Sequence, residues 1–159
     1  MEIDAAGTRP IEWQLDDGKS AKNDDGELHF DWSTNTVTGV VEGKPVHLTA
    51  EPGTQDRSSI MIAVTTLLLR GEEPGTIPMI DDNRIKRYVY SRKESAVIDS
   101  ALGRINTVLY ESNREGGSSR TSRFWMAPGL EFLPVRAEQV RKGKVETVMV
   151  LQKLESEAP

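Results

Sequence analysis

Alternation of apolar and polar residues dominates the chain and predicts short β-strands. The clearest case runs from Leu28 to Trp32, where positions 28, 30 and 32 are apolar and the two between them are polar. Residues 36–41 are rich in β-branched side chains, and residues 46–49 follow after a turn at Glu42-Gly43. Because only short turns separate these runs, they predict a meander of antiparallel neighbours.

One segment, residues 56–70, has the length and composition of a helix. Thr54 or Asp56 can accept hydrogen bonds from its first N–H groups, and Gly71 follows it, as is common at a helix C-terminus. Apolar residues cover almost its whole circumference, so we expect other elements to cover the helix on most sides. A buried strand is the competing interpretation, and the length and both caps favour the helix.

After a loop at residues 72–83, which contains two prolines, the pattern predicts strands only. They are expected at residues 84–91, 95–99, 102–111, 119–140 as a hairpin, and 145–154. The last run is partly apolar on both faces, which predicts a position away from a wet sheet edge. A short strand at residues 10–15 is also predicted within the polar first 27 residues.

These elements together predict an α+β fold made mainly of antiparallel strands. A long antiparallel sheet twists and curls, and the helix is the one predicted element that can fill its concave face. The expected architecture is a curved sheet or half-barrel wrapped around one apolar helix at about residues 56–70. We expect a polar, partly disordered leading segment over residues 1–27, a single β-rich domain over 28–154 and a tail over 155–159.

Charge and composition argue against several classes of function. The 159 residues carry a formal net charge of −5, and an acidic domain is a poor partner for nucleic acid. The one basic cluster, at Arg136, Arg141, Lys142 and Lys144, is interpreted as a solvated hairpin tip. The chain contains no cysteine, which excludes disulfides, cysteine zinc sites and thiol nucleophiles within it.

No pattern of catalytic or metal-binding residues emerges. His29 and His47 lie in predicted strands without a third ligand at metal-site spacing, and alternation places His29 in solvent. Adjacent aspartates at 16–17, 24–25 and 81–82 lie in turns and lack the spacing of a calcium loop. Phosphate-binding loops and the serine-nucleophile elbow are also missing. We therefore expect no enzyme activity, metal or cofactor, and an uncharacterised hydrolase is the weakest alternative.

Aromatic and aliphatic residues predict either a filled core or an apolar-ligand cavity between sheet and helix. The residues expected to line such a cavity are Met61, Val64, Leu68, Tyr88, Tyr110, Trp125, Phe132 and Val150. The expected partners are a hydrophobic small molecule or lipid, or a membrane-associated protein.

Several short motifs occur in an order that resembles a known family. They are Phe30-Asp31-Trp32, Gln55-Asp56-Arg57, Gly103, Phe124-Trp125-Met126, Pro128-Gly129 and Leu133-Pro134-Val135-Arg136. From about residue 30 to 154 the chain resembles the bacterial cell-envelope family called domain of unknown function 3108. Its hairpin around Trp125 is similar to that of outer-membrane lipoprotein carriers and related periplasmic sensors.

The resemblance implies a periplasmic location and an apolar ligand in a half-barrel, and it implies no catalytic residues. If Met1 is the native start, a cytoplasmic location is expected instead. Members of the family usually have several strands before the Phe-Asp-Trp position, where this chain has only a short polar segment. We therefore expect a non-enzymatic periplasmic domain that binds an apolar ligand or an envelope partner. The alternative is a structural or interaction domain with a filled core and an exposed strand edge.

Overall fold

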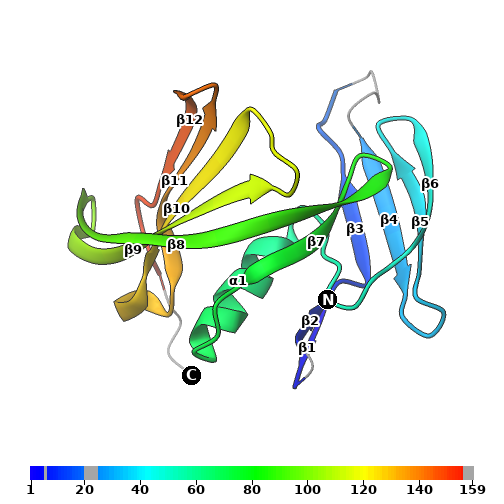
Figure 1. The fold of residues 1–159 in the computed structure, drawn as a ribbon, viewed down its shortest axis with the longest axis horizontal. Coiled ribbons are helices and arrows are strands. Elements are labelled where there is room, and N and C mark those ends of the chain that lie inside the picture. The colour runs from blue at the N-terminus through cyan, green and yellow to red at the C-terminus, as the bar shows by residue number, and fades with distance from the viewer. Residues whose placement is uncertain (6, 20–24, 156–159) are drawn as a thin grey trace. The chain divides into compact units, whose positions relative to one another are not determined.

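The structure is a computed structural model that describes residues 1–5, 7–19 and 25–155 (Figure 1). Its elements are β1 (Glu2–Asp4), β2 (Gly7–Arg9), β3 (Glu12–Leu15), β4 (Gly26–Asp31), β5 (Thr36–Val41), β6 (Lys44–Thr49), α1 (Ser59–Leu69), β7 (Gly75–Asp81), β8 (Arg84–Ser100), β9 (Gly103–Arg114), β10 (Arg120–Ala127), the 3₁₀ turn η1 (Pro128–Leu130), β11 (Leu133–Arg141) and β12 (Lys144–Val150).

The chain forms two compact units. Unit 1 consists of Met1–Arg70 and Thr76–Tyr88, and unit 2 consists of Gly71–Gly75 and Val89–Pro159. Strand β8 therefore contributes its first residues to unit 1 and the remainder to unit 2. The boundaries expected from the sequence for a leading segment, a single domain and a tail stay a prediction, although the leading segment forms the three strands β1, β2 and β3.

The predicted fold class is confirmed: the described residues form mainly antiparallel β-sheet with one α-helix, and the curved sheets stay open. The strands form a β1-β2 pair, a four-stranded sheet in the order β3-β4-β5-β6, and a sheet in the order β12-β11-β10-β9-β8-β7. Neighbours in the chain are neighbours in the sheets because short turns join them.

The four-stranded sheet of unit 1 follows the predicted alternation. Leu28 and Phe30 of β4 are buried, whereas His29 between them is exposed, as predicted. The hydrophobic core around these two residues consists of Trp13, Leu28, Phe30, Val37, Val41, Val46, Ala50 and Ile80. The strand predicted at residues 10–15 is β3, and it contributes Trp13 to this core.

Gly39 marks the closest approach of two strands in this sheet. It lies in β5 with φ 153° and pairs with Leu28 of β4. A Cβ atom at this position would lie 2.0 Å from the Glu27 carbonyl oxygen. Only glycine therefore fits here without displacing the β4 backbone.

Helix α1 is shorter than predicted and is buried on one side. Asp56 Oδ1 accepts hydrogen bonds from the backbone N–H groups of Ser58 and Ser59, each at 2.8 Å, and Gly71 has φ 76°. Both predicted end signals are thus present. The buried residues of α1 are Ser59, Ile60, Ala63, Val64 and Leu68.

The expectation that α1 is covered on most sides is wrong for two of its residues. Ile62 and Leu69 are 40% and 55% exposed, because the contact with β2 uses only one stripe of the helix. Within the part of the chain that the structure describes, no helix has the length and apolar character needed to cross a membrane.

Two further corrections concern β7 and β8. The predicted loop at residues 72–83 contains β7, in which Ile77 and Ile80 are buried. Its Pro78 lies in an outer strand of the sheet, where proline's missing N–H is tolerated. The two strands predicted at residues 84–91 and 95–99 form the single strand β8.

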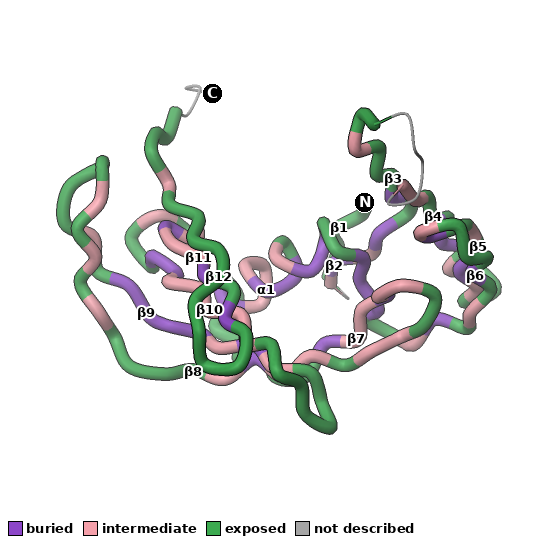
Figure 2. Tube along the Cα trace, turned by 90° about the horizontal axis from the view of Figure 1, so that it is seen from above, coloured by how far each residue is buried: buried purple, intermediate pink, exposed green. Residues whose placement is uncertain are grey.

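Strands β9 to β12 lie side by side in unit 2, and β12 is the outer strand (Figure 1). All seven residues of β12 are exposed, so the prediction that this strand lies away from a wet edge is wrong (Figure 2). Apolar residues on both faces are typical of a buried strand, but here they belong to a solvated edge.

Candidate functional site

The residues predicted to line an apolar cavity are divided between the two units. Unit 1 contains Met61, Val64 and Leu68 of α1 and Tyr88 of β8. Val64 and Leu68 are buried, and Met61 is half-buried. The Tyr88 hydroxyl donates a hydrogen bond of 2.8 Å to Asp81 Oδ2. In unit 1 these side chains therefore serve packing and a polar contact.

Unit 2 contains Tyr110, Trp125, Phe132 and Val150. Trp125 of β10 pairs with Arg136 of β11, which in turn pairs with Val150 of β12, so these residues share one face of the sheet. Tyr110 pairs with Phe124, the neighbour of Trp125, and so lies on the opposite face. The structure brings Trp125 and Val150 to one face and separates Tyr110 from them.

Trp125 and Tyr110 each contact a charged side chain. The Arg136 guanidinium lies over the Trp125 ring, 5.4 Å from its centre, which is a cation–π contact. Tyr110 is 1% exposed, and its hydroxyl donates to Glu73 Oε2 at 3.1 Å. Burial and the nearby Glu73 carboxylate both raise the pKa of Tyr110.

Unit 2 also contains an open groove that the sequence did not reveal. The groove has a volume of about 390 Å³. Its lining residues are Ser95, Ala96 and Val97 of β8, Asn106, Thr107 and Val108 of β9, and Pro128 of η1. Val97 is 52% exposed, and the Thr107 hydroxyl donates to the Ala96 carbonyl oxygen at 2.8 Å. The lining is therefore mostly apolar, with a few small polar groups.

A strained turn positions the Pro128 side of this groove. Glu131 and Phe132, directly after η1, have φ values of 55° and 58°, in the left-handed region that residues other than glycine avoid. The Phe132 N–H donates to the Ala127 carbonyl oxygen at 2.9 Å and closes the turn. Two consecutive residues in this conformation imply that the surrounding contacts hold the turn in place.

Asp81 forms the centre of a charged network in unit 1. Its carboxylate accepts hydrogen bonds from Tyr88, from Lys86 Nζ at 3.0 Å and from Arg57 Nη2 at 2.9 Å. Burial raises the pKa of Asp81, but the hydrogen bonds from these three partners outweigh burial and lower it to about 2. Arg57 also pairs with Asp82 at 3.3 Å. The sequence predicts only a turn at Asp81, because its partner Arg57 lies 24 residues before it.

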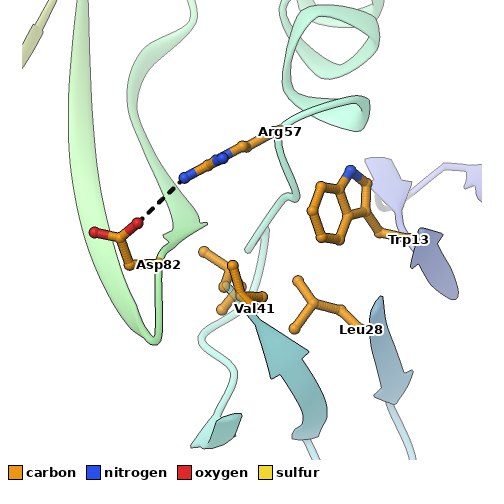
Figure 3. A pocket seen from close by; sticks show the side chains of 6 residues that line it. Trp13, Leu28, Val41, Arg57 and Asp82 are labelled. Carbon is orange, nitrogen blue, oxygen red and sulfur yellow. Dashed lines mark hydrogen bonds and ion pairs between the residues drawn. The ribbon is translucent and has the colours of Figure 1, made fainter. Parts of the chain in front are cut away.

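This network closes over an apolar patch of the same unit. Figure 3 shows Arg57 reaching toward Asp82 beside Trp13, Leu28 and Val41. The space among these side chains leaves no room for a water molecule. We interpret this part of unit 1 as the closely packed edge of its core, with no space for a ligand.

The segment that carries Arg57 joins three parts of unit 1. The backbone of Gln55 exchanges hydrogen bonds of 2.9 Å with Pro78 and Ile80 of β7. Its side-chain Nε2 donates to the Thr8 carbonyl oxygen at 2.8 Å. Gln55 is only 2% exposed, so this polar segment fixes β2, β7 and the start of α1 to one another. Its function is therefore structural.

A second acidic group lies in the turn after β3. Asp16, Asp17 and Asp25 each offer an oxygen atom within 4.8 Å of the others. Their oxygens also serve the turn: Asp25 Oδ1 accepts from the Asp17 N–H, and Asp16 Oδ1 accepts from the Gly18 N–H at 2.8 Å. Asp24, the other half of one predicted pair, lies outside the described residues. The contacts agree with the predicted turn role.

Comparison with known proteins identifies a family. A protein-family model with the description "Protein of unknown function (DUF3108)" matches residues 2–150. No curated protein and no solved structure matches the chain. The match also includes residues 2–29, which lie before the part of the chain that the sequence resemblance covers. The similarity to lipoprotein carriers stays a prediction. The chain belongs to the family of proteins of unknown function called DUF3108.

Proposed function

We propose that this protein is a non-enzymatic binding domain of the bacterial cell envelope that holds an apolar or lipid-like group in the groove of unit 2. The observation that carries the proposal is the groove itself, about 390 Å³ in volume and open to solvent. Pockets for small ligands commonly have volumes of roughly 300–1,000 Å³, with apolar walls and a few polar groups. The groove therefore fits one small apolar ligand or a segment of an acyl chain.

The composition of the groove favours binding over catalysis. Ala96, Val97, Val108 and Pro128 offer apolar contact, and Ser95 and Asn106 offer hydrogen bonds to a carbonyl or hydroxyl group of the ligand. None of the seven lining residues is titratable, whereas acid–base and nucleophilic catalysis depend on such groups. The periplasmic location is part of the proposal and is supported by the family resemblance alone.

The proposal is tested by titrating the whole chain with 11-(dansylamino)undecanoic acid, a fluorescent fatty acid. The probe is expected to gain blue-shifted emission with one site per chain. Val97→Asp places a carboxylate in the groove and should weaken binding at least tenfold, which corresponds to about 1.4 kcal/mol. A loss of this size is close to the lower end of the roughly 1.5–3 kcal/mol for fully burying an apolar side chain such as valine.

Val145→Asp is the matched control, because Val145 is another exposed valine of unit 2 and lies outside the groove. This variant should bind the probe as the unmodified chain does. The proposal fails if the probe does not bind, or if both variants weaken binding equally.

A further inference from the structure

The outer edge of β12 presents unpaired backbone groups. Among the described residues, β12 pairs only with β11. The Leu151 N–H donates to the Val135 carbonyl oxygen at 2.9 Å, directly after the pair of Val150 with Arg136. In an antiparallel ladder the direction of these groups alternates, so the N–H and C=O groups of Val148 and Val150 point away from β11. They can pair with another strand.

The same edge exposes apolar side chains on both faces of the sheet. Val148 and Val150 lie on the face of Glu138 and Arg136, and Met149 lies on the other face. They are 47%, 47% and 67% exposed. A strand that pairs with β12 would bury part of this surface on both faces, in addition to forming backbone hydrogen bonds.

The turn that precedes β12 carries positive charge without a partner. Arg141, Lys142 and Lys144 are all exposed. No carboxylate of the described residues forms an ion pair with them, whereas nearby Arg136 pairs with Glu138 at 2.7 Å. Three unpaired cations stand out in a chain of net charge −5. They would attract acidic residues to this end of the edge.

From these observations we infer that β12 is a docking strand for an extended segment of another protein, with acidic residues at the segment's C-terminal end. A segment antiparallel to β12 finishes beside the turn, so its C-terminal residues face Arg141, Lys142 and Lys144. Its alternate residues lie beside Val148, Val150 and Met149, which favours apolar or β-branched side chains there. The segment would extend the sheet by one strand.

A second copy of this chain fits the edge less well. A strand aligned antiparallel to β12 from another copy would place residues 151–155 toward the cationic turn, and that stretch contains Lys153 as well as Glu155. Lys153 and Glu155 already pair with each other. The pairing of β12 with β11 also shifts its register between Gln139 and Val140 of β11, and such a bulge disfavours the pairing of two identical edges.

The test uses a synthetic peptide with three Thr-Val repeats followed by three aspartates and a free C-terminus. The full chain, labelled with ¹⁵N, is titrated with this peptide and monitored by NMR. The amides of Val148 and Val150 are expected to shift and to exchange with solvent at least tenfold more slowly. A peptide with the three aspartates at its N-terminus should bind at least threefold more weakly.

Two variants separate the backbone contribution from the charge contribution. Val148→Pro removes one outward N–H and should weaken peptide binding at least tenfold, whereas Val148→Thr keeps that donor and should bind within twofold of the unmodified chain. Lys142→Glu combined with Lys144→Glu should weaken binding at least fivefold and abolish the preference between the two peptides. This charge variant keeps the test valid if Val148→Pro does not fold.

Three results would overturn the inference. The first is no change at the β12 amides with peptide at 2 mM, on the order of the weakest specific interactions. The second is equal binding of the two peptides to the unmodified chain. The third is a concentration-dependent shift of the β12 amides without peptide, which would show that a second copy occupies the edge.

Discussion

The Asp81 carboxylate is expected to stabilise unit 1 only while it is ionised. Its three hydrogen-bonding partners lower its pKa from an ordinary value of 3.8 to about 2, despite burial, which raises it. Each pH unit of such a difference corresponds to about 1.4 kcal/mol, so the network contributes about 2 kcal/mol to the free energy of unfolding at neutral pH. This value is an upper bound, because the side chain is 20% exposed and salt screens its charges.

The sign of the effect follows from the lowered pKa. Above pH 3.8 the carboxylate is charged in both the folded and the unfolded chain, and the full stabilisation is present. As the pH falls from about 4 to about 2, the unfolded chain takes up the proton first and the stabilisation is lost. Asp81→Asn should therefore lower the stability by about 2 kcal/mol at pH 7, with a difference from the unmodified chain that shrinks toward pH 2.

Urea unfolding at several pH values provides the measurement. Trp13 and Trp32 report on unit 1 when Trp125, the third tryptophan, is replaced by Phe in both proteins. The control is Asp99→Asn, because the Asp99 side chain is 89% exposed and its removal should leave stability unchanged. The reasoning is refuted if Asp81→Asn matches the unmodified chain at pH 7, or if the difference between them does not depend on pH.

Three further substitutions test the packing and the turn. Gly39→Ala should lower the free energy of unfolding by at least about 3 kcal/mol, because the alanine Cβ would collide with the Glu27 carbonyl oxygen. An unchanged thermal unfolding curve, measured by circular dichroism, would contradict this. Glu131→Gly should raise the free energy of unfolding, measured with urea, by about 0.5–1 kcal/mol, since glycine adopts the left-handed backbone conformation of residue 131 without strain. A loss of stability would show that Glu131 is not strained. Tyr110→Phe removes the hydrogen bond to Glu73 and should lower the free energy of unfolding by about 1 kcal/mol in the same assay. An unchanged free energy of unfolding would show that this hydrogen bond does not stabilise the fold.

Local pattern was enough to predict much of the fold. The alternation at Leu28, His29 and Phe30 gave the correct faces of β4, because one face of that strand packs in a core and the other meets water. The helix was predicted from its apolar stretch and from end signals at Asp56 and Gly71, which the structure also uses.

The elements that the sequence missed depend on distant partners. Pro74, Gly75 and Pro78 are turn signals, yet β7 forms because its backbone exchanges hydrogen bonds with Gln55 and because Ile80 enters a core. No local pattern contains these contacts. The edge position of β12 was missed for a related reason, since apolar residues on both faces occur in central strands and at binding edges alike.

The candidate site was less predictable than the fold. Its groove requires the facing strands of the β8-β9 hairpin and the more distant turn at Pro128 to lie together, and none of these carries a chemical motif. Asp81 illustrates the same limit, because Arg57 lies 24 residues before it. The sequence predicts an apolar lining made of large residues, and none of those residues lines the groove of unit 2.

The interleaved course of the chain restricts how this protein can be assembled and divided. The chain changes units after Arg70, after Gly75 and after Tyr88, so neither unit is one continuous piece. On a ribosome, unit 1 cannot complete its core until β7 and the start of β8 have emerged, whereas β9 to β12 pair in the order of their synthesis. A fragment that ends at Arg70 lacks Ile80 and should fail to fold. Evolution by exchange of domains would likewise have to move both units together.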